Sequence, residues 1–221
     1  MVARGDLGTE IPSEVVPIEQ KKMIKTCRRR NKICIVATEM LETMMENARP
    51  KRAETSDIAN AVLDGTDAVM LSGETTVGKH PIETVEAMAR ICEVTEKYAD
   101  YNYVEEMRFV ANARDAIATA VVDTANRLNA KLITTATVHG RTARLISNFR
   151  PKAPILALTP SEKDGRRLML NYGIYPVLMP LMNSTDEVLE HSVEAAKEFT
   201  ELSQGDIVVI TGGFPNTDEN R

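Results

Sequence analysis

Asp64-Gly-Thr-Asp-Ala-Val-Met-Leu-Ser-Gly-Glu-Thr75 is the stretch that decides the fold predicted for the first third of this chain. Its short apolar run is followed at once by small and acidic residues, which predicts a buried strand ending in a polar loop. Two earlier blocks have the same form: Met1-Val-Ala-Arg-Gly-Asp-Leu-Gly8 and Ala37-Thr-Glu-Met-Leu-Glu42. Helix-like segments separate the blocks. This alternation is typical of a (β/α) barrel, whose chemistry lies where the strands end.

The remaining segments of the first hundred residues fit this alternation. Helices are predicted over 17–30, 54–63 and from Pro81 onward, a helical turn over 40–46, and strands over 33–37 and 67–71. The last helix is expected to bury one apolar stripe, formed by Ile82, Val85, Met88, Ala89 and Cys92. Only three βα units are visible, and the first starts at residue 1, so we expect the end of a TIM-type barrel.

A second α/β domain is predicted beyond the tyrosine-rich stretch Tyr98–Glu106. Its pattern indicates a helix over 113–128 and strands over 131–135, 155–158, 174–178 and 206–211, with helices between them. Thr159-Pro-Ser-Glu162 and Ser184-Thr-Asp-Glu187 have the sequence of helix capping boxes. The alternation implies a mostly parallel, doubly wound sheet. We therefore expect domains at 1–98 and 113–221, joined by a junction at 99–112.

Composition excludes several classes of protein. The net charge is −5, from 27 basic and 32 acidic groups, which argues against a nucleic-acid partner. No apolar run is long enough to span a membrane and no signal peptide opens the chain, so we expect a cytoplasmic protein with no membrane partner. The cysteines lack CxxC spacing and are expected to be reduced, and the histidines stand apart, so no zinc site is predicted.

Two polar residues follow predicted strands and are candidates for chemistry. Asp6 is either an ordinary turn former or a carboxylate that holds a divalent metal, because Mg²⁺ needs only one or two protein carboxylates beside substrate oxygens. Thr38 either packs in the strand or directs its hydroxyl into the rim, where it contacts substrate or orders a water. The residues themselves leave both choices open.

Two loops have phosphate-binding character. Gly73-Glu-Thr-Thr-Val-Gly78-Lys79 fits G-x-x-x-x-G-K, but His80 stands where a P-loop needs Ser or Thr, so no P-loop is expected. Thr137-Val-His-Gly-Arg-Thr142 lies between a strand and a helix. Its hydroxyls, its arginine and the amides of a helix N-terminus suit a phosphate, and a plain βα turn is the equally weighted alternative.

Together these blocks resemble the pyruvate kinase family. The resemblance rests on Met1–Gly8, Ala37–Glu42, Arg52–Glu54 and Asp64–Thr75 in the barrel, and on Phe149–Ile155 and Gly173–Val177 in the C-terminal domain. It implies strands 6 to 8 of the barrel followed by the regulatory α/β domain. The implied reaction is phosphoryl transfer from phosphoenolpyruvate to ADP, giving pyruvate and ATP in glycolysis, with Mg²⁺ and K⁺ as cofactors. The full-length protein is then expected to be a homotetramer.

The resemblance also implies roles for individual residues. Asp6 would be a metal ligand, and Thr38 and Ser72 would be catalytic, with Glu74 in the same cleft. The residues implied to bind substrate are Ala3, Arg4, Gly5, Asp6 and Thr38. Those implied to bind a phosphorylated allosteric effector are Thr137, His139, Gly140, Arg141 and Thr142.

Departures from the family pattern limit these expectations. The family's catalytic lysine, its second metal carboxylate and its potassium ligands correspond to sequence preceding Met1, and the last strand of the C-terminal domain is expected to be lost after Arg221. We therefore expect a fragment that is inactive alone. Glu39 replaces a common glutamine and His139 a usual serine. Two alternatives remain: a non-catalytic module for metabolite sensing or subunit interaction, and an inert product of a truncated gene.

Overall fold

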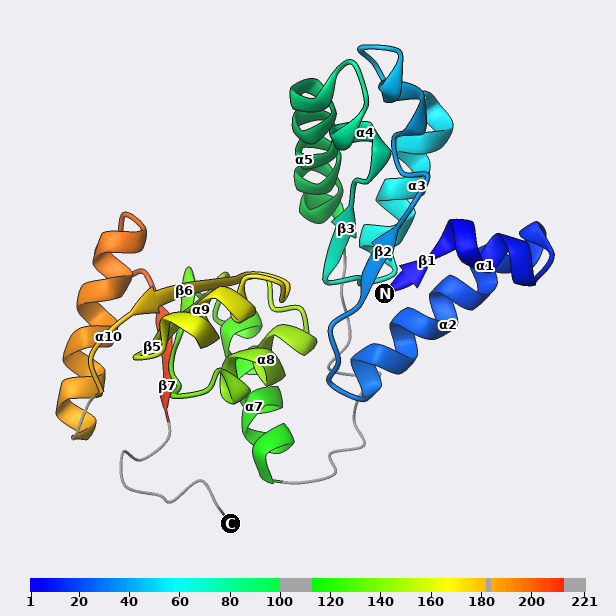
Figure 1. The fold of residues 1–221 in the computed structure, drawn as a ribbon. Helices are drawn as coiled ribbons and strands as arrows, with labels where there is room; N and C mark the ends of the chain where they lie inside the picture. Colours follow the sequence, from blue (N-terminus) through cyan, green and yellow to red (C-terminus); the bar gives the residue numbers. More distant parts are fainter. Residues whose placement is uncertain (100–112, 182–183, 213–221) are drawn as a thin grey trace. The chain divides into compact units, whose positions relative to one another are not determined.

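A computed structural model describes residues 1–99, 113–181 and 184–212, and the chain divides into two compact units, Met1–Tyr101 and Asn102–Arg221 (Figure 1). The predicted junction at 99–112 lies almost wholly outside the described residues, as does the expected loss of a strand beyond Arg221. The bounds of the two domains therefore stay a prediction.

The first unit is built on a parallel sheet in the order β1-β2-β3. Its strands are β1 (Val2–Ala3), β2 (Ile35–Ala37) and β3 (Ala68–Met70). Its helices are α1 (Arg4–Glu10), α2 (Val16–Arg29), α3 (Arg52–Leu63), α4 (Gly73–Thr76) and α5 (Pro81–Tyr98), with 3₁₀ turns η1 (Ser13–Val15) and η2 (Glu42–Met45). The parallel strands and their crossover helices confirm the α/β class predicted from the sequence.

The core of the first unit lies between this sheet and its helices. Val36 of β2 is fully buried and packs with Ile24 of α2, Ile58 of α3 and Met88 of α5. Cys34 lies in the same core, and burial raises the pKa of its thiol to about 12, so the group stays protonated at neutral pH. All the cysteines are free thiols, as predicted.

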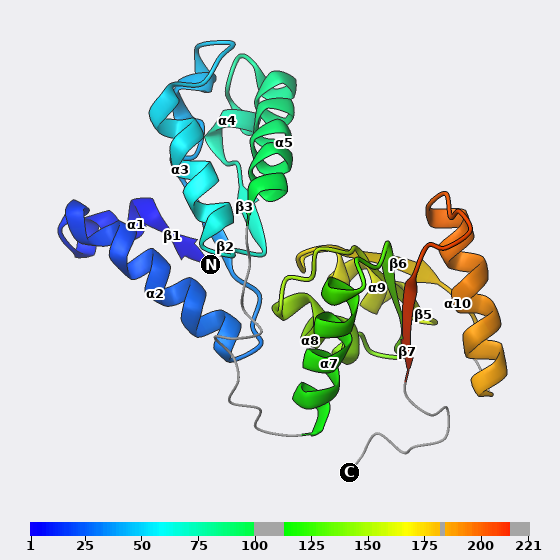
Figure 2. The same ribbon diagram turned by 180° about the vertical axis from the view of Figure 1, so that it is seen from behind.

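The apolar stripe predicted for α5 is wrong in its N-terminal half. Ile82 and Val85 are 71% and 52% exposed and Ala89 is exposed too, whereas Thr84, Ala87 and Met88 are buried. Figures 1 and 2 show α5 beside α3, and two of the three buried residues of α5, Thr84 and Ala87, have small side chains. The hydroxyl of Thr84 donates to the backbone oxygen of His80 at 2.6 Å, so its burial leaves no polar group unsatisfied.

The second unit contains a parallel sheet in the order β6-β5-β4-β7. The strands are β4 (Leu132–Ala136), β5 (Ile155–Thr159), β6 (Ile174–Leu178) and β7 (Val208–Gly212). The helices are α7 (Ala113–Arg127), α8 (Arg141–Asn148), α9 (Glu162–Leu168) and α10 (Thr185–Phe199).

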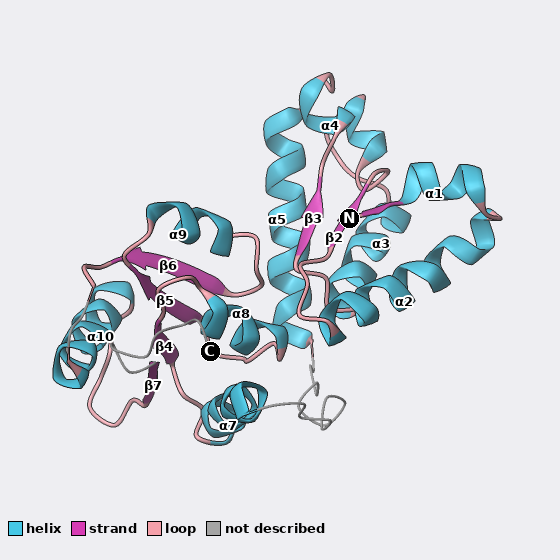
Figure 3. Cartoon of the chain, turned by 60° about the horizontal axis from the view of Figure 1, so that its bottom comes forward, coloured by secondary structure: helices cyan, strands magenta, loops and turns pink. Residues whose placement is uncertain are grey.

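Helices cover both faces of this sheet, as Figure 3 shows for α8 and α10. Ile133 belongs to one core, shared with α7 and α8, whereas the neighbouring Leu132 belongs to the other, shared with α10. Side chains that alternate between two cores are what a doubly buried parallel strand requires. The prediction of a doubly wound sheet is therefore confirmed.

The two predicted capping boxes differ in outcome. Ser184 caps α10 as predicted, since its hydroxyl accepts from the amide of Glu187 at 3.1 Å. Before α9, however, the capping residue is Ser161 rather than Thr159. Thr159 is the last residue of β5, and its hydroxyl donates to the backbone oxygen of Val138 at 3.0 Å. Strand pairing therefore moves the helix start two residues along the chain.

Candidate active site at the strand ends of the first unit

The carboxyl ends of β1, β2 and β3 meet at one edge of the sheet. Ala3 is in register with Ala37, and Ala37 with Met70, so the loops after the three strands lie next to one another. The amide of Gly5 donates to the hydroxyl of Thr38 at 2.8 Å, which joins the first loop to the second. The register thus brings together the segments in which the sequence placed its candidate residues.

The segment after β1 is a helix, α1, where the sequence suggested a loop. Asp6 lies exposed in its first turn, where an acidic side chain complements the positive end of the helix dipole. It is not the cap, because the N-cap position is Ala3. Among the described residues its carboxylate has no hydrogen-bond or ion-pair partner, so both oxygens are free to bind a ligand.

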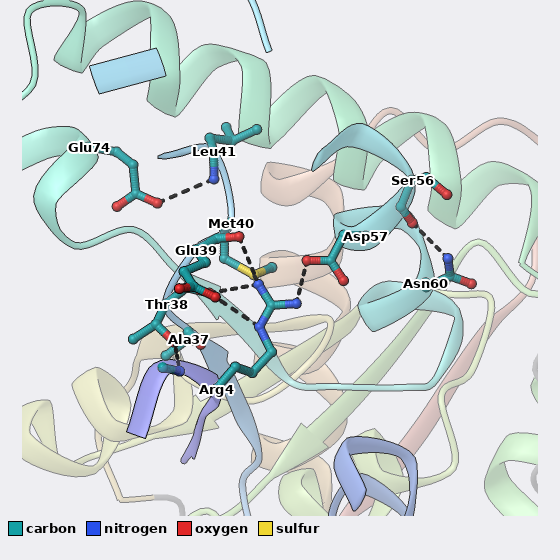
Figure 4. A network of polar contacts seen from close by, with 11 residues as sticks. Arg4, Ala37, Thr38, Glu39, Met40, Leu41, Ser56, Asp57, Asn60 and Glu74 are labelled. Atoms are coloured by element: carbon teal, nitrogen blue, oxygen red, sulfur yellow. Dashed lines mark hydrogen bonds and ion pairs between the residues drawn. The ribbon is translucent and has the colours of Figure 1, made fainter. Parts of the chain in front are cut away.

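The side chain of Arg4 turns toward the loop after β2 (Figure 4). Its Nη2 donates to the backbone oxygens of Thr38 and Glu39 at 2.6 and 3.0 Å, and its Nε donates to the Thr38 oxygen at 3.2 Å. Nη1 forms an ion pair with Asp57 of α3. The guanidinium is thus committed to protein groups, and only the backbone of Arg4 remains for the substrate role that the family resemblance implied.

Thr38 and Glu39 form a turn in an unfavourable conformation. Their φ angles are +71° and +54°, the left-handed region that non-glycine residues rarely adopt. Such residues cost on the order of 1–3 kcal/mol each and persist only where the surroundings hold them. Here the Thr38 hydroxyl donates to the oxygen of Ala37 at 2.6 Å and accepts from Gly5, while Arg4 binds both carbonyl oxygens.

Glu74, which was expected to face the cleft, is only 3% exposed. Its carboxylate accepts from the amide of Ser72 at 2.7 Å and from the amide of Leu41 at 3.2 Å, and so bridges the loops after β3 and β2. Burial alone would raise the pKa of Glu74, but the hydrogen bonds from these and neighbouring backbone amides outweigh it, and the pKa lies below its ordinary value. The hydroxyl of Ser72 has no partner among the described residues.

The segment that fits G-x-x-x-x-G-K forms the short helix α4 and its C-terminal turn. The amide of Gly78 donates to the oxygen of Gly73 at 3.0 Å, and Lys79 forms an ion pair with Glu46. A Cβ on Gly78 would lie 2.4 Å from the backbone oxygen of Glu74, so this glycine permits a close backbone approach. These contacts occupy groups that a P-loop would offer to phosphate.

A pocket of about 640 Å³ lies beside Arg4, and Glu39 of the turn is one of its lining residues. It lies between α2 and α3, and Arg4, Gln20, Lys21, Asp57 and Asp64 are among the residues that line it. Lys21 and Asp64 form a second ion pair there. The Arg4–Asp57 and Lys21–Asp64 ion pairs therefore both border this pocket.

In the second unit, the predicted effector loop follows β4 and leads into α8. Gly140 is the N-cap of α8 with φ +74°, and a Cβ at this position would lie 2.6 Å from a methyl carbon of Leu168. His139 faces Asp164, with Nδ1 and Oδ2 3.4 Å apart, and the pKa of Asp164 is lowered by its hydrogen bonds to Ser161 and His139. Thr142 lies in the first turn of α8. The backbone amides of this turn come before Arg144, whose amide donates to the oxygen of Gly140, and such amides at the start of a helix have no acceptor within the helix.

Comparison with known proteins decides the family. The model of the pyruvate kinase barrel domain matches residues 1–85, and the model of the pyruvate kinase alpha/beta domain matches residues 115–220. The chain belongs to the pyruvate kinase family. Both domains predicted from the sequence motifs are therefore represented, in the predicted order.

Individual pyruvate kinases are similar over nearly the whole chain. The enzyme of Clostridium acetobutylicum is 46% identical over 97% of this chain, and that of Geobacillus stearothermophilus is 47% identical over 97%. A crystal structure of a pyruvate kinase from Cryptosporidium parvum covers 94% of this chain with a TM-score of 0.89 and 40% identity. The chain spans 46%, 37% and 44% of these proteins, respectively, which is less than half of each.

The metal site implied by the pyruvate kinase family can be tested against the residues present. Among the described residues, no group of three or more His, Cys, Asp or Glu side chains is placed to hold a metal ion. The unpaired, exposed carboxylate of Asp6 fits the role of a single ligand to Mg²⁺, which takes its other ligands from water and substrate oxygens.

No described helix is long and apolar enough to cross a membrane.

Proposed function

We propose that this chain forms the part of a pyruvate kinase active site that lies on the last strands of the barrel. The observation that carries the proposal is the 2.8 Å hydrogen bond from the amide of Gly5 to the hydroxyl of Thr38, which links the loops after β1 and β2. Beside it, the carboxylate of Asp6 and the hydroxyl of Ser72 have no partner among the described residues. The proposed substrates are phosphoenolpyruvate and ADP, and the proposed products are pyruvate and ATP.

Each group has a distinct part in this proposal. The backbone of Ala3 to Gly5 binds substrate, and Asp6 would hold Mg²⁺, which neutralises charge on the phosphoryl group when bound. The hydroxyl of Thr38 lies on the side where the enolate carbon takes up its proton. Ser72, on the neighbouring loop, supplies a hydroxyl to the same cleft.

The remaining groups of the site are proposed to come from the other part of the barrel. Within the described residues, the sheet of the first unit contains three strands, whereas a TIM barrel closes with eight. We propose that the chain alone does not catalyse the reaction, that K⁺ is bound by the other part, and that the full-length protein is a cytoplasmic homotetramer.

A hybrid enzyme tests the proposal. The segment of the Geobacillus stearothermophilus pyruvate kinase that aligns with this chain would be replaced by residues 1–221. We expect Mg²⁺-dependent pyruvate formation from the hybrid enzyme, and none from the chain alone or from the remaining segment alone. A hybrid that folds, as judged by circular dichroism, but makes no pyruvate would contradict the proposed site. Activity of the chain alone would contradict the proposal that it needs the other part.

A second candidate function is the binding of a phosphorylated effector by the loop after β4. In a doubly wound sheet, ligands bind at the carboxyl ends of the strands where the chain reverses its direction of winding. The order β6-β5-β4-β7 places this point beside the end of β4, where the loop begins. The guanidinium of Arg141 and the hydroxyls of Thr137 and Thr142 have no partner among the described residues. These groups and the amides of α8 suit a phosphate.

Calorimetry with sugar phosphates and AMP tests this second candidate. We expect saturable heat from one of these ligands, and loss of that heat on Thr142→Ala, because the substitution removes a hydroxyl beside the helix amides. Thr185→Ala, in the first turn of α10, is the matched control and should leave binding unchanged. Absence of heat from every ligand would favour the reading of an inert chain.

A further inference from the structure

We infer that Asp57 of α3 is a positioning residue, which acts through Arg4 to hold the Thr38–Glu39 turn and so to place the hydroxyl of Thr38. The inference rests on the proposed function of Thr38. The family resemblance implies no role for Asp57. Among the described residues, its link to the turn runs through the guanidinium of Arg4 (Figure 4).

The turn depends on contacts from outside itself. Two successive residues with side chains adopt positive φ, and Thr38 is β-branched, which makes this conformation least favourable for it. Its carbonyl oxygens point to one guanidinium, which donates three hydrogen bonds to them. Arg4 is therefore the side chain that stabilises the unusual direction of both carbonyl groups.

Arg4 in turn depends on Asp57 for its orientation. An arginine side chain has several rotatable bonds, and a planar guanidinium is fixed when a carboxylate binds one edge. Among the described residues, Asp57 is the carboxylate that contacts Arg4. It stands next to Ile58, which is fully buried and anchors α3 in the core. A rigid helix thus supplies the fixed point for the side chain.

A role in stability alone fits Asp57 poorly. Its side chain is 37% exposed, whereas that of Arg4 is 10% exposed, and Asp57 lines the pocket beside Arg4. Ion pairs open to water contribute little to folding. The clearest consequence of the pair is therefore the geometry of the turn and not the stability of the fold.

The matched comparison is between Asp57→Asn and Asp64→Asn. Asp64 lines the same pocket and pairs with Lys21, but it has no contact with Arg4 or with the turn among the described residues. In the isotope-labelled chain, Asp57→Asn should shift the amide signals of Thr38 and Glu39 and speed the exchange of the Gly5 amide. Asp64→Asn should leave these signals in place, and Asp57→Glu should restore them.

Unchanged signals in Asp57→Asn, or equal changes in both variants, would overturn the inference. A second measurement uses the hybrid enzyme. Asp57→Asn should lower its kcat by about tenfold while KM changes little, because loss of a residue that orients a functional group costs about 10–100-fold in comparable sites. The same kcat for Asp57→Asn and unmodified hybrid would also overturn it. If the hybrid is inactive, the proposed function fails, whereas the amide signals still decide whether Asp57 holds the turn.

Discussion

Asp6→Asn is expected to lower kcat of the hybrid enzyme by about a thousandfold, because a bound metal supplies several kcal/mol of transition-state stabilisation. The substitution keeps the size of the side chain but removes the charge that a hard divalent cation prefers. Since the Asp6 carboxylate is exposed and has no partner among the described residues, its loss should leave the fold intact. The effect should therefore appear in catalysis and in the Mg²⁺ concentration required.

The measurement is the rate of pyruvate formation across a Mg²⁺ titration, with thermal unfolding as the check on folding. Glu10→Gln is the matched control, because Glu10 is an exposed acidic residue at the other end of the same helix, α1. It should change neither kcat nor the Mg²⁺ requirement. An Asp6→Asn enzyme with unmodified Mg²⁺ dependence would show that Asp6 is not a metal ligand.

Glu74→Ala is expected to destabilise the first unit by about 3 kcal/mol, because it leaves the buried amide of Leu41 and the half-buried amide of Ser72 without an acceptor, and a buried amide without an acceptor costs about 1–3 kcal/mol. The amides belong to Leu41 and Ser72, so the damage should be concentrated in the loops after β2 and β3. Hydrogen exchange of the β2 amides reports on this unit separately from the second. Glu42→Ala, at an exposed position of η2, is the control and should have little effect.

The contribution of Glu74 should depend on pH in a defined direction. Its folded-state pKa lies below the ordinary value of 4.5, because the charged carboxylate accepts hydrogen bonds from the amides despite its burial. The stabilisation is therefore present above pH 4.5 and is lost as the pH falls through the folded-state pKa. The difference between unmodified and Glu74→Ala chains should shrink over that range. A difference that grows on acidification would contradict this role.

Sequence reasoning missed the short helices α1 and α4 and the 3₁₀ turn η1, and it misplaced the buried face of α5. Helix α1 was missed because Gly5 and Gly8 lower helix propensity and no side chain caps the helix at Ala3. The face of α5 was misplaced because Ile82 and Val85 are apolar, whereas the buried face carries the smaller Thr84 and Ala87. In α5, packing within the folded unit overrode the local preference.

The contacts of two carboxylates that organise the candidate site could not be found from the sequence pattern. Asp57 is 53 residues from Arg4, and Glu74 is 33 residues from Leu41. Nothing in the spacing of either acidic residue distinguishes it from the other acidic residues on these helices. Their roles appear only when the strand register brings the loops of β1, β2 and β3 to one edge.

The sequence by itself determined the family, the order of strands and helices, and the segments that carry Asp6, Thr38 and Ser72, because each follows from local motifs and periodicity. Only the tertiary structure decided that Arg4 serves the Thr38 turn, that Glu74 is a buried bridge, and that Asp57 belongs to the same network. The physical reason is the range of the interactions. Backbone preferences act over a few neighbouring residues, whereas side-chain pairing across loops requires the sheet to be assembled first.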